Sequence, residues 1–189
     1  MTSEDVLSFW FSEGPDTHRP AWFQKNDAFD DSIRQQFGAL VVPAREGALD
    51  GWAETPLGAL ALLIVLDQFP RNLFRGSAEA FASDAHARDI ARAVVAKGWD
   101  MRVTCTQRSF LYLPFEHSES MADQHLSVAL FEGMRDDRVK AAPGGSIDYA
   151  WRHWFLIRDF GRFPHRNAAL ARTSTSQEVI YLSQPGAGF

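Results

Sequence analysis

Residues 57–66 form an uninterrupted run of ten apolar residues, and Thr55-Pro56 before it supplies a helix cap and a first-turn proline. A helix that is apolar on every side has to be covered by other helices, so this run predicts a central helix in a helical core. The run is about half as long as a membrane span requires. Asp67 and Gln68 follow directly, which brings two polar side chains close to the predicted core.

Helical spacing of apolar residues recurs along most of the 189-residue chain, whereas the alternation typical of strands never persists. We therefore predict an all-α fold with a single domain over residues 1–189 and about eight or nine helices. Residues 1–25 should form an N-terminal cover and residues 185–189 an irregular tail. Helix starts are predicted at Thr2 or Ser3, Asn26 or Asp27, Thr55, Ser83 or Asp84, and Thr175 with Glu178.

An apolar helical pattern ends twice in Phe-Pro followed by cationic and amide side chains, at residues 69–72 and 163–167. Proline lacks a backbone donor and disfavours helix in the residue before it, so each pair predicts a helix end. The carboxylate of Asp67 near the core needs a cationic partner. Such a network is either a structural clasp or a binding site, and both remain open. The candidate partners are Arg71, Arg75, Arg162, Arg166 and Arg172.

The apolar pattern of residues 147–160 predicts a helix that Gly161 ends and that sets His153 among apolar side chains. A neutral histidine satisfied by one hydrogen bond fits this setting. A general base or a ligand-binding imidazole tuned by burial fits it as well. The sequence does not choose between these roles.

A Glu-His-Ser-Glu sequence follows shortly after Pro114, and the pattern predicts one long helix over residues 116–134 with this proline in its first turn. Glu116 and Glu119 would then favour the positive end of that helix. Metal sites in helical bundles usually contain Glu-x-x-His pairs, and this segment has none, while His117 and Glu119 diverge on a helix. We therefore predict no metal site and no cofactor.

The chain carries 24 acidic against 19 basic residues, a formal net charge of −5, which argues against a nucleic-acid-binding surface. Cys105 is the single cysteine, so no intramolecular disulfide can form and a reducing compartment is expected. The acidic first five residues lack the apolar stretch of a secretion signal. We expect a cytoplasmic protein without nucleic-acid or membrane partners; the oligomeric state does not follow from the sequence.

Three motifs carry a resemblance to a known family. They are Leu-Asp-Gln-Phe-Pro-Arg-Asn-Leu-Phe-Arg-Gly at residues 66–76, Tyr-Leu-Pro-Phe-Glu-His-Ser-Glu at 112–119 with Asp-Gln at 123–124, and Phe-Gly-Arg-Phe-Pro-His-Arg-Asn at 160–167. Through them the chain resembles the bacterial family known as domain of unknown function 924 over residues 6–186. The resemblance implies a tetratricopeptide-like stack of antiparallel helices, and it supplies no activity.

The chain departs from the family pattern at two positions after the second Phe-Pro. Ala171 stands before Arg172 where the family has glycine, and Gln177 stands where the family tends to have an acid. These differences concern the turn that follows Pro164 and leave the other motif residues unchanged.

The first compatible function is a binding module. Arginine, histidine and asparagine side chains together suit a small anionic metabolite, such as a carboxylate or phosphate, or a peptide terminus. In this hypothesis the motif segments line one shared polar cleft between apolar helices. The predicted ligand-binding residues are Gln68, Arg71, Asn72, Arg75, Glu119, Arg162, His165, Arg166 and Asn167.

The second compatible function is a hydrolase or lyase acting on a small polar substrate. Arg71 or Arg166 would hold the negative charge that develops during the reaction. The predicted catalytic residues are His117 or His153 as the general base and Asp67 or Glu116 as the carboxylate that orients it.

The third compatible function is a scaffold that recognises another protein through aromatic side chains. Trp10, Phe11, Trp22 and Phe23 lie in a segment that contains glycine and prolines, which leaves room for exposed rings. The alternative is that these rings pack on the helices as the N-terminal cover.

Overall fold

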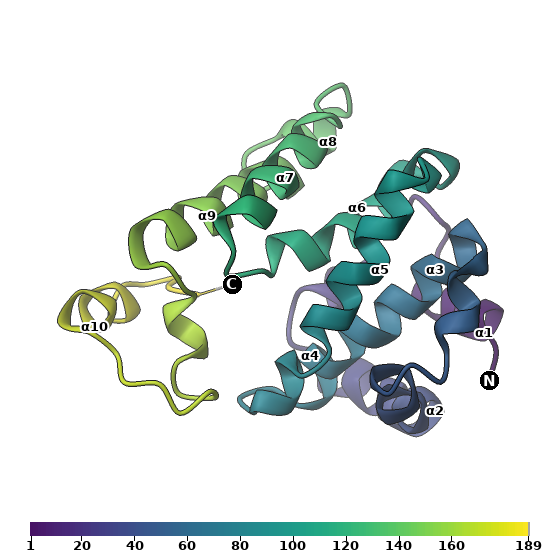
Figure 1. The fold of residues 1–189 in the computed structure, drawn as a ribbon, viewed down its shortest axis with the longest axis horizontal. Coiled ribbons are helices and arrows are strands. Elements are labelled where there is room, and N and C mark those ends of the chain that lie inside the picture. Colours follow the sequence, from purple (N-terminus) through teal and green to yellow (C-terminus); the bar gives the residue numbers. More distant parts are fainter. Residues whose placement is uncertain (189) are drawn as a thin grey trace. The chain divides into compact units, whose positions relative to one another are not determined.

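The computed structural model describes residues 1–188, which contain helices and no β-strand (Figure 1). Eight α-helices of the described chain have seven residues or more, as the sequence predicts. Residues 185–188 of the predicted tail are not helical, and Phe189 lies outside the described residues. The helices are α1 Ser3–Trp10, α2 Asp27–Arg45, α3 Pro56–Leu63, α4 Phe69–Leu73, α5 Asp84–Ala96, α6 Cys105–Glu116, α7 Met121–Glu132, α8 Arg138–Ala141, α9 Ser146–Phe160 and α10 Ser176–Leu182.

The described residues divide into two compact units. Unit 1 comprises Met1–Arg75 and Glu79–Pro114, and unit 2 comprises Gly76–Ala78 and the chain from Phe115 onward. Helices α1–α5 and most of α6 therefore belong to unit 1, and α7–α10 belong to unit 2. The single domain expected from chain length stays a prediction. No helix among the described residues is long and apolar enough to cross a membrane.

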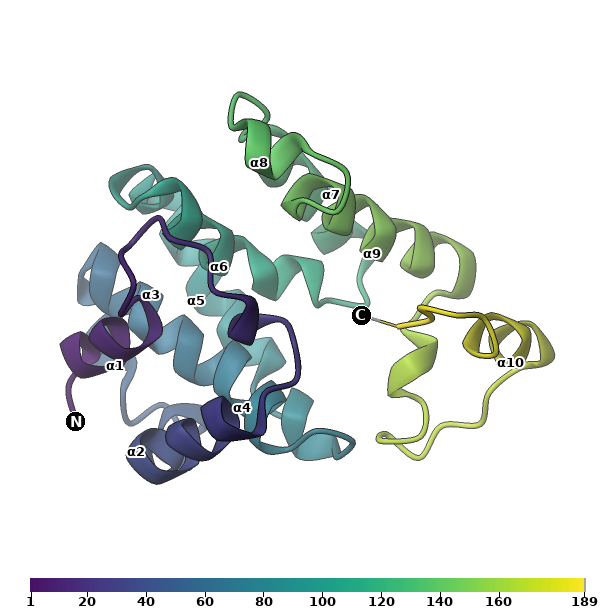
Figure 2. The same ribbon diagram turned by 180° about the vertical axis from the view of Figure 1, so that it is seen from behind.

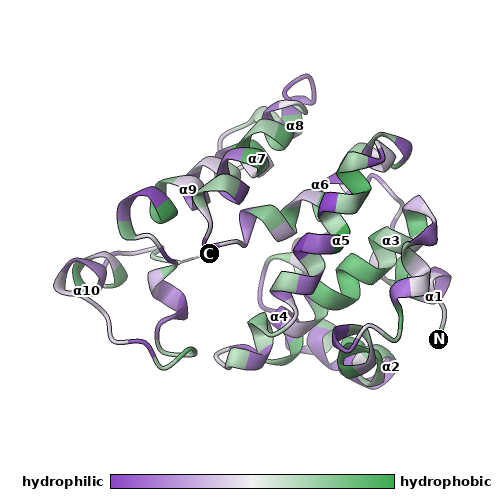
Figure 3. Ribbon diagram, viewed as in Figure 1, coloured by the Kyte–Doolittle hydropathy of each residue, from purple (hydrophilic) through white to green (hydrophobic). Residues whose placement is uncertain are grey.

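Helix α3 is the centre of unit 1, as its uniformly apolar sequence predicts. Its residues from Gly58 to Leu63 are all buried, and the green colour of α3 along its length in Figure 3 shows the absence of a polar face. Helices α1 and α5 pack against it. Because every side is covered, whatever follows α3 directly in the chain also begins inside the core.

The helix does not end at the first Phe-Pro, so that prediction is wrong. The chain continues from α3 through a π-helical segment, Ile64–Gln68, labelled η3, into α4, which contains Pro70. A proline within a helix leaves the carbonyl four residues earlier without its usual donor. Here that carbonyl belongs to Leu66, and the buried hydroxyl of Ser83 donates to it at 2.5 Å. A donor from another segment thus replaces the missing backbone bond.

Replacing Ser83 by alanine should lower the free energy of unfolding by about 1–3 kcal/mol, because the buried Leu66 carbonyl loses its donor. Urea unfolding followed by circular dichroism measures the change. Ser32→Ala is the matched control, since the Ser32 hydroxyl donates to the Ala28 carbonyl on an exposed part of α2. Equal effects of the two substitutions would contradict this role of Ser83.

The N-terminal residues of unit 1 contribute aromatic rings that pack on its helices. After α1 the chain passes over α6 before it reaches α2 (Figure 2). The rings of Trp10 and Trp22 are stacked 5.9 Å apart, and Trp22 lies 5.0 Å from Phe110 of α6. Trp10, Phe11 and Trp22 are buried, and Phe23 is exposed. One exposed ring does not make an aromatic recognition surface, so this segment gives little support to the scaffold hypothesis.

In unit 2, α7 and α9 lie side by side as an antiparallel pair, with α8 in the connection between them (Figure 1). The predicted helix over residues 116–134 is wrong: α6 runs through Pro114 and ends at Glu116, and α7 begins only at Met121. The free energy gained by the complete burial of Phe115 offsets the loss of the backbone hydrogen bond that Pro114 cannot make. Glu119 consequently lies in the connection between two helices and not on a helical acidic stripe.

Candidate functional site

The predicted site residues fall into one set in each unit. The single shared cleft stays a prediction. The unit 1 set is Asp67, Gln68, Arg71, Asn72 and Arg75, and the unit 2 set is Glu116, His117, Glu119, His153, Arg162, His165, Arg166 and Asn167.

Asp67 is the buried centre of the polar network in unit 1. Its carboxylate accepts a hydrogen bond from Gln68 at 2.6 Å and lies 3.1 Å from the guanidinium of Arg71, as predicted. Arg71 also donates two hydrogen bonds to the carboxylate of Asp84, at 3.0 and 3.1 Å. Two acids therefore share one arginine and tie the end of the central helix to α5. This geometry is that of a structural clasp.

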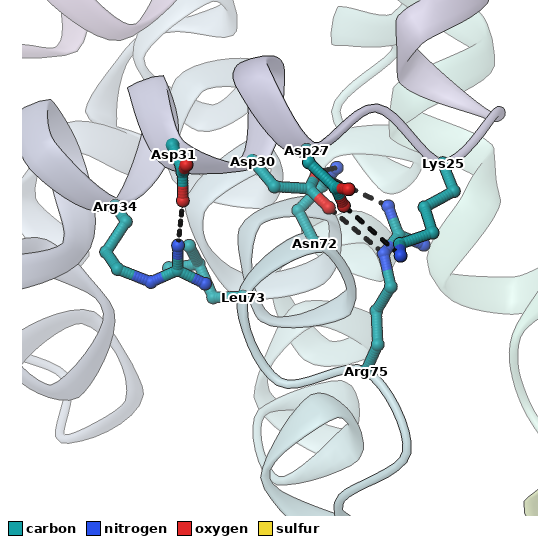
Figure 4. Close-up of a pocket in the computed structure, with 8 residues that line it drawn as sticks. All are labelled: Lys25, Asp27, Asp30, Asp31, Arg34, Asn72, Leu73 and Arg75. Carbon is teal, nitrogen blue, oxygen red and sulfur yellow. Dashed lines mark hydrogen bonds and ion pairs between the residues drawn. The ribbon is translucent and has the colours of Figure 1, made fainter.

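The other two residues of the unit 1 set bind Asp30 of α2. Asn72 donates to its carboxylate at 2.7 Å, and Arg75 donates at 3.1 and 3.3 Å (Figure 4). A surface pocket of about 380 Å³ adjoins these contacts. The other charged side chains that line the pocket are also paired with one another: Lys25 contacts Asp27, and Arg34 contacts Asp31. An anion would have to displace these carboxylates.

In unit 2, Glu178 of α10 binds two residues of the predicted set. Arg162 donates to both of its oxygens at 2.6 and 2.7 Å, and Asn167 donates at 3.3 Å. The backbone N–H of Thr175 completes the shell at 2.7 Å. The hydrogen bonds from Arg162 lower the pKa of Glu178 to about 2. The sequence pattern predicts only a capping role for Glu178, because the partner Arg162 lies 16 positions away.

Glu119 joins the connection after α6 to the turn after α9. Its carboxylate accepts hydrogen bonds from Arg172 at 2.7 and 3.0 Å and from the backbone N–H of Phe163 at 2.8 Å. Burial raises the pKa of Glu119, but these donors outweigh that effect and hold its pKa below the usual value. Glu119 is therefore occupied by protein donors.

Ala171 has a φ of 52°, in the left-handed region where the side chain of an L-residue is strained. This is the position at which the resembling family has glycine. Ala171→Gly should therefore raise the free energy of unfolding by about 1 kcal/mol. Thermal unfolding measures it, with Ala168→Gly three residues earlier as the control. A melting temperature that does not rise contradicts the strain argument.

Three predicted catalytic residues come together in unit 2. Glu116 and His117 stand at the end of α6, His153 stands in the middle of α9, and one ligand-type atom from each lies within 4.8 Å of the other two. The Glu116 carboxylate lies 3.3 Å from Nδ1 of His153, and the two imidazole rings are 6.1 Å apart. Glu116 and His153 are buried, whereas His117 is half-buried. The fourth predicted catalytic residue, Asp67, belongs to unit 1.

The hydrogen bonds of His153 define its tautomer. Nδ1 lies 2.8 Å from the carbonyl oxygen of Tyr149 and 3.3 Å from the Glu116 carboxylate, and both oxygens are acceptors. Nδ1 therefore carries the proton, and the neutral ring has its lone pair on Nε2. Burial, followed by the charge of His117, lowers the pKa of His153 well below its usual value. The imidazole is consequently neutral at pH 7.

His165 and Arg166 belong to the surroundings of this cluster. Arg166 is buried, with its guanidinium 4.6 Å from the centre of the Phe163 ring, and that ring in turn contacts His153 edge-on. Burial and the charges of Arg166 and His117 lower the pKa of His165 to about 4. The site therefore combines neutral imidazoles with one buried positive charge.

Gln124 positions the segment that carries Glu116 and His117. It is completely buried on α7, and its Nε2 donates at 2.7 Å to the carbonyl oxygens of both Glu116 and Ser118. These carbonyls follow the end of α6 and need a donor from outside that helix. The sequence pattern does not reveal this role of Gln124, because it predicts one helix over residues 116–134.

These features define an all-helical protein with a buried carboxylate–imidazole cluster in its C-terminal unit. The chain belongs to the bacterial proteins of unknown function of the DUF924 family, whose model matches residues 6–186. It is similar to a solved structure, the protein of unknown function ATU0120 from Agrobacterium tumefaciens, with 37% sequence identity over 97% of each chain and a TM-score of 0.85. No curated protein matches the chain.

Proposed function

We propose that the protein hydrolyses a small polar substrate and that Glu116, His117 and His153 activate the attacking water. The observation that carries this proposal is the approach of three potential ligand or base atoms to within 4.8 Å of one another. A carboxylate beside a neutral imidazole in buried surroundings suits general-base catalysis. This is the second of the functions compatible with the sequence, with Glu116 as the carboxylate from the two candidates Asp67 and Glu116.

The tautomer of His153 suits it to the role of base. Its Nε2 lone pair would take a proton from water as the water oxygen bonds to the electrophilic carbon or phosphorus of the substrate. The imidazolium would then return that proton to the departing group. Glu116, 3.3 Å from Nδ1, would stabilise the imidazolium, and the buried charge of Arg166 would stabilise the developing negative charge.

The anion-binding hypothesis receives less support from the geometry. Three arginines of the predicted binding set, Arg71, Arg75 and Arg162, already bind the carboxylates of Asp84, Asp30 and Glu178. An anionic metabolite or peptide terminus would have to displace a carboxylate at each of these places.

The cytoplasm is the compartment that we propose for this activity. The single cysteine, Cys105, supports it, because a chain with one thiol has no intramolecular disulfide to preserve in an oxidising compartment. The net charge of −5 gives no support to nucleic-acid partners.

A panel of small esters, phosphate esters and amides tests the activity of the purified protein. We expect turnover of at least one class, and a loss of about 10²–10⁴ in kcat/KM in His153→Ala, the contribution typical of a general base. His86→Ala in unit 1 is the control and should leave turnover unchanged, because His86 instead contacts Asp50. Turnover of no class, or turnover that His153→Ala leaves intact, contradicts the proposal.

A further inference from the structure

This inference rests on the proposed site and concerns what that site holds. We infer that Glu116, His117 and His153 bind a zinc-type divalent ion. Two imidazoles and one carboxylate are the protein ligands of many catalytic zinc sites, where water takes the fourth position. The sequence predicts no metal because residues 116–134 contain no Glu-x-x-His pair on one helix. The present set joins the end of α6 to the middle of α9.

The distances are compatible with one ion. Zinc lies roughly 2.0–2.2 Å from nitrogen and oxygen ligands, so two ligand atoms of a tetrahedral site are separated by about 3.4 Å and in any geometry by at most about 4.4 Å. The three ligand atoms here lie within 4.8 Å of one another. This spread is close to the upper limit for ligands of one ion.

The contacts of His153 are those expected around a metal ligand. Metal-bound histidines usually donate their other ring N–H to a carbonyl or carboxylate, which fixes the ring and its tautomer. The Nδ1–H of His153 makes this contact with the Tyr149 carbonyl at 2.8 Å.

The backbone around the other two ligands is held by residues outside the cluster. Gln124 bonds the carbonyls of Glu116 and Ser118, and the Ser118 hydroxyl donates to Asp123 at 2.8 Å. Glu119 then connects the segment to the turn that begins at Phe163. The ligand-bearing turn is thus braced on both sides. With zinc bound, His153 would serve as a ligand and not as the base. The ion would then activate the bound water by lowering its pKa.

Zinc titration of protein first stripped with EDTA tests the inference. Calorimetry should show one Zn²⁺ per chain for the wild type. Glu116→Gln and His117→Ala should weaken binding at least about tenfold, the lower limit seen even when only an outer partner of a metal ligand is removed. His86→Ala is the matched control, because His86 is half-buried like His117 and lies 3.0 Å from the exposed carboxylate of Asp50, outside the cluster.

A wild type that binds no stoichiometric zinc overturns the inference, and so does zinc binding that Glu116→Gln and His117→Ala leave unchanged. Helical circular dichroism verifies that both variants are folded, and His117, which is half-buried, is the substitution with the smaller cost to folding. Visible absorption of Co²⁺ in the wild type gives a second readout that needs no variant. Hydrolysis that persists in EDTA would contradict the zinc inference and leave the proposed function standing. Zinc binding without any hydrolysis would contradict the proposed function and leave the zinc inference standing.

Discussion

Asp67→Ala should destabilise the protein by about 3 kcal/mol, as much as the truncation of a buried leucine such as Leu62 of α3. The carboxylate of Asp67 is 1% exposed and contacts both Arg71 and Gln68. Its removal leaves the half-buried guanidinium of Arg71 with one carboxylate partner in place of two. Incomplete pairing of a charge away from water is strongly destabilising. Urea unfolding of the substituted and wild-type proteins measures the effect.

Asp31→Ala is the matched control for Asp67→Ala, because Asp31 pairs with Arg34 on the exposed face of α2. Removing this exposed pair should cost less than about 1 kcal/mol. If Asp67→Ala costs no more than the control, Asp67 is not part of a structural clasp, and a role in ligand binding regains support. A loss comparable to that of Leu62→Ala identifies the network around Asp67 as structural.

Acidification should destabilise the protein progressively between about pH 5 and pH 2, and Glu178 should account for a distinct part of this loss. The hydrogen bonds from Arg162 lower the pKa of Glu178 from 4.5 to about 2 in the folded state. Above pH 4.5 the carboxylate is ionised in both states, and its contacts contribute fully. Between these pH values the unfolded chain takes up the proton first, so stability falls as pH falls.

Glu178→Gln removes the titrating group and should flatten the stability profile between pH 5 and pH 2, at the cost of lower stability at pH 7. Chemical unfolding at a series of pH values measures both effects. Asp148→Asn is the control, since it removes one charge from an exposed pair with Arg152 at the start of α9. A Glu178→Gln profile parallel to that of the wild type would show that Glu178 does not link folding to acid.

Local signals in the sequence predicted most of the helix starts. The side chains of Thr2, Asn26, Thr55 and Thr175 each accept a hydrogen bond from the first turn of a helix, as their positions suggested. Such caps could be predicted because donor and acceptor are three positions apart, so no distant segment takes part. Gly161 likewise ends α9 with a positive φ of 69°.

The two errors in the helix pattern have one physical cause. The local pattern predicts a helix boundary at Pro70 and at Pro114, and both prolines lie inside helices. Proline removes one backbone bond, and a helix continues through it when other contacts offset that loss. Around Pro70 the donor comes from Ser83, and beyond Pro114 the gain comes from the buried Phe115. Both compensations depend on tertiary contacts that a local pattern does not contain.

The sequence by itself determined the helical class, the central position of α3 and the residue types of the site, because apolar periodicity and capping act over a few neighbouring positions. Only the tertiary structure decided which charges pair and which side chains meet. Arg162 binds Glu178, and Glu116 and His117 meet His153 across 36 positions of sequence. Such pairing depends on how helices pack, and the free energy of packing is shared among many distant residues.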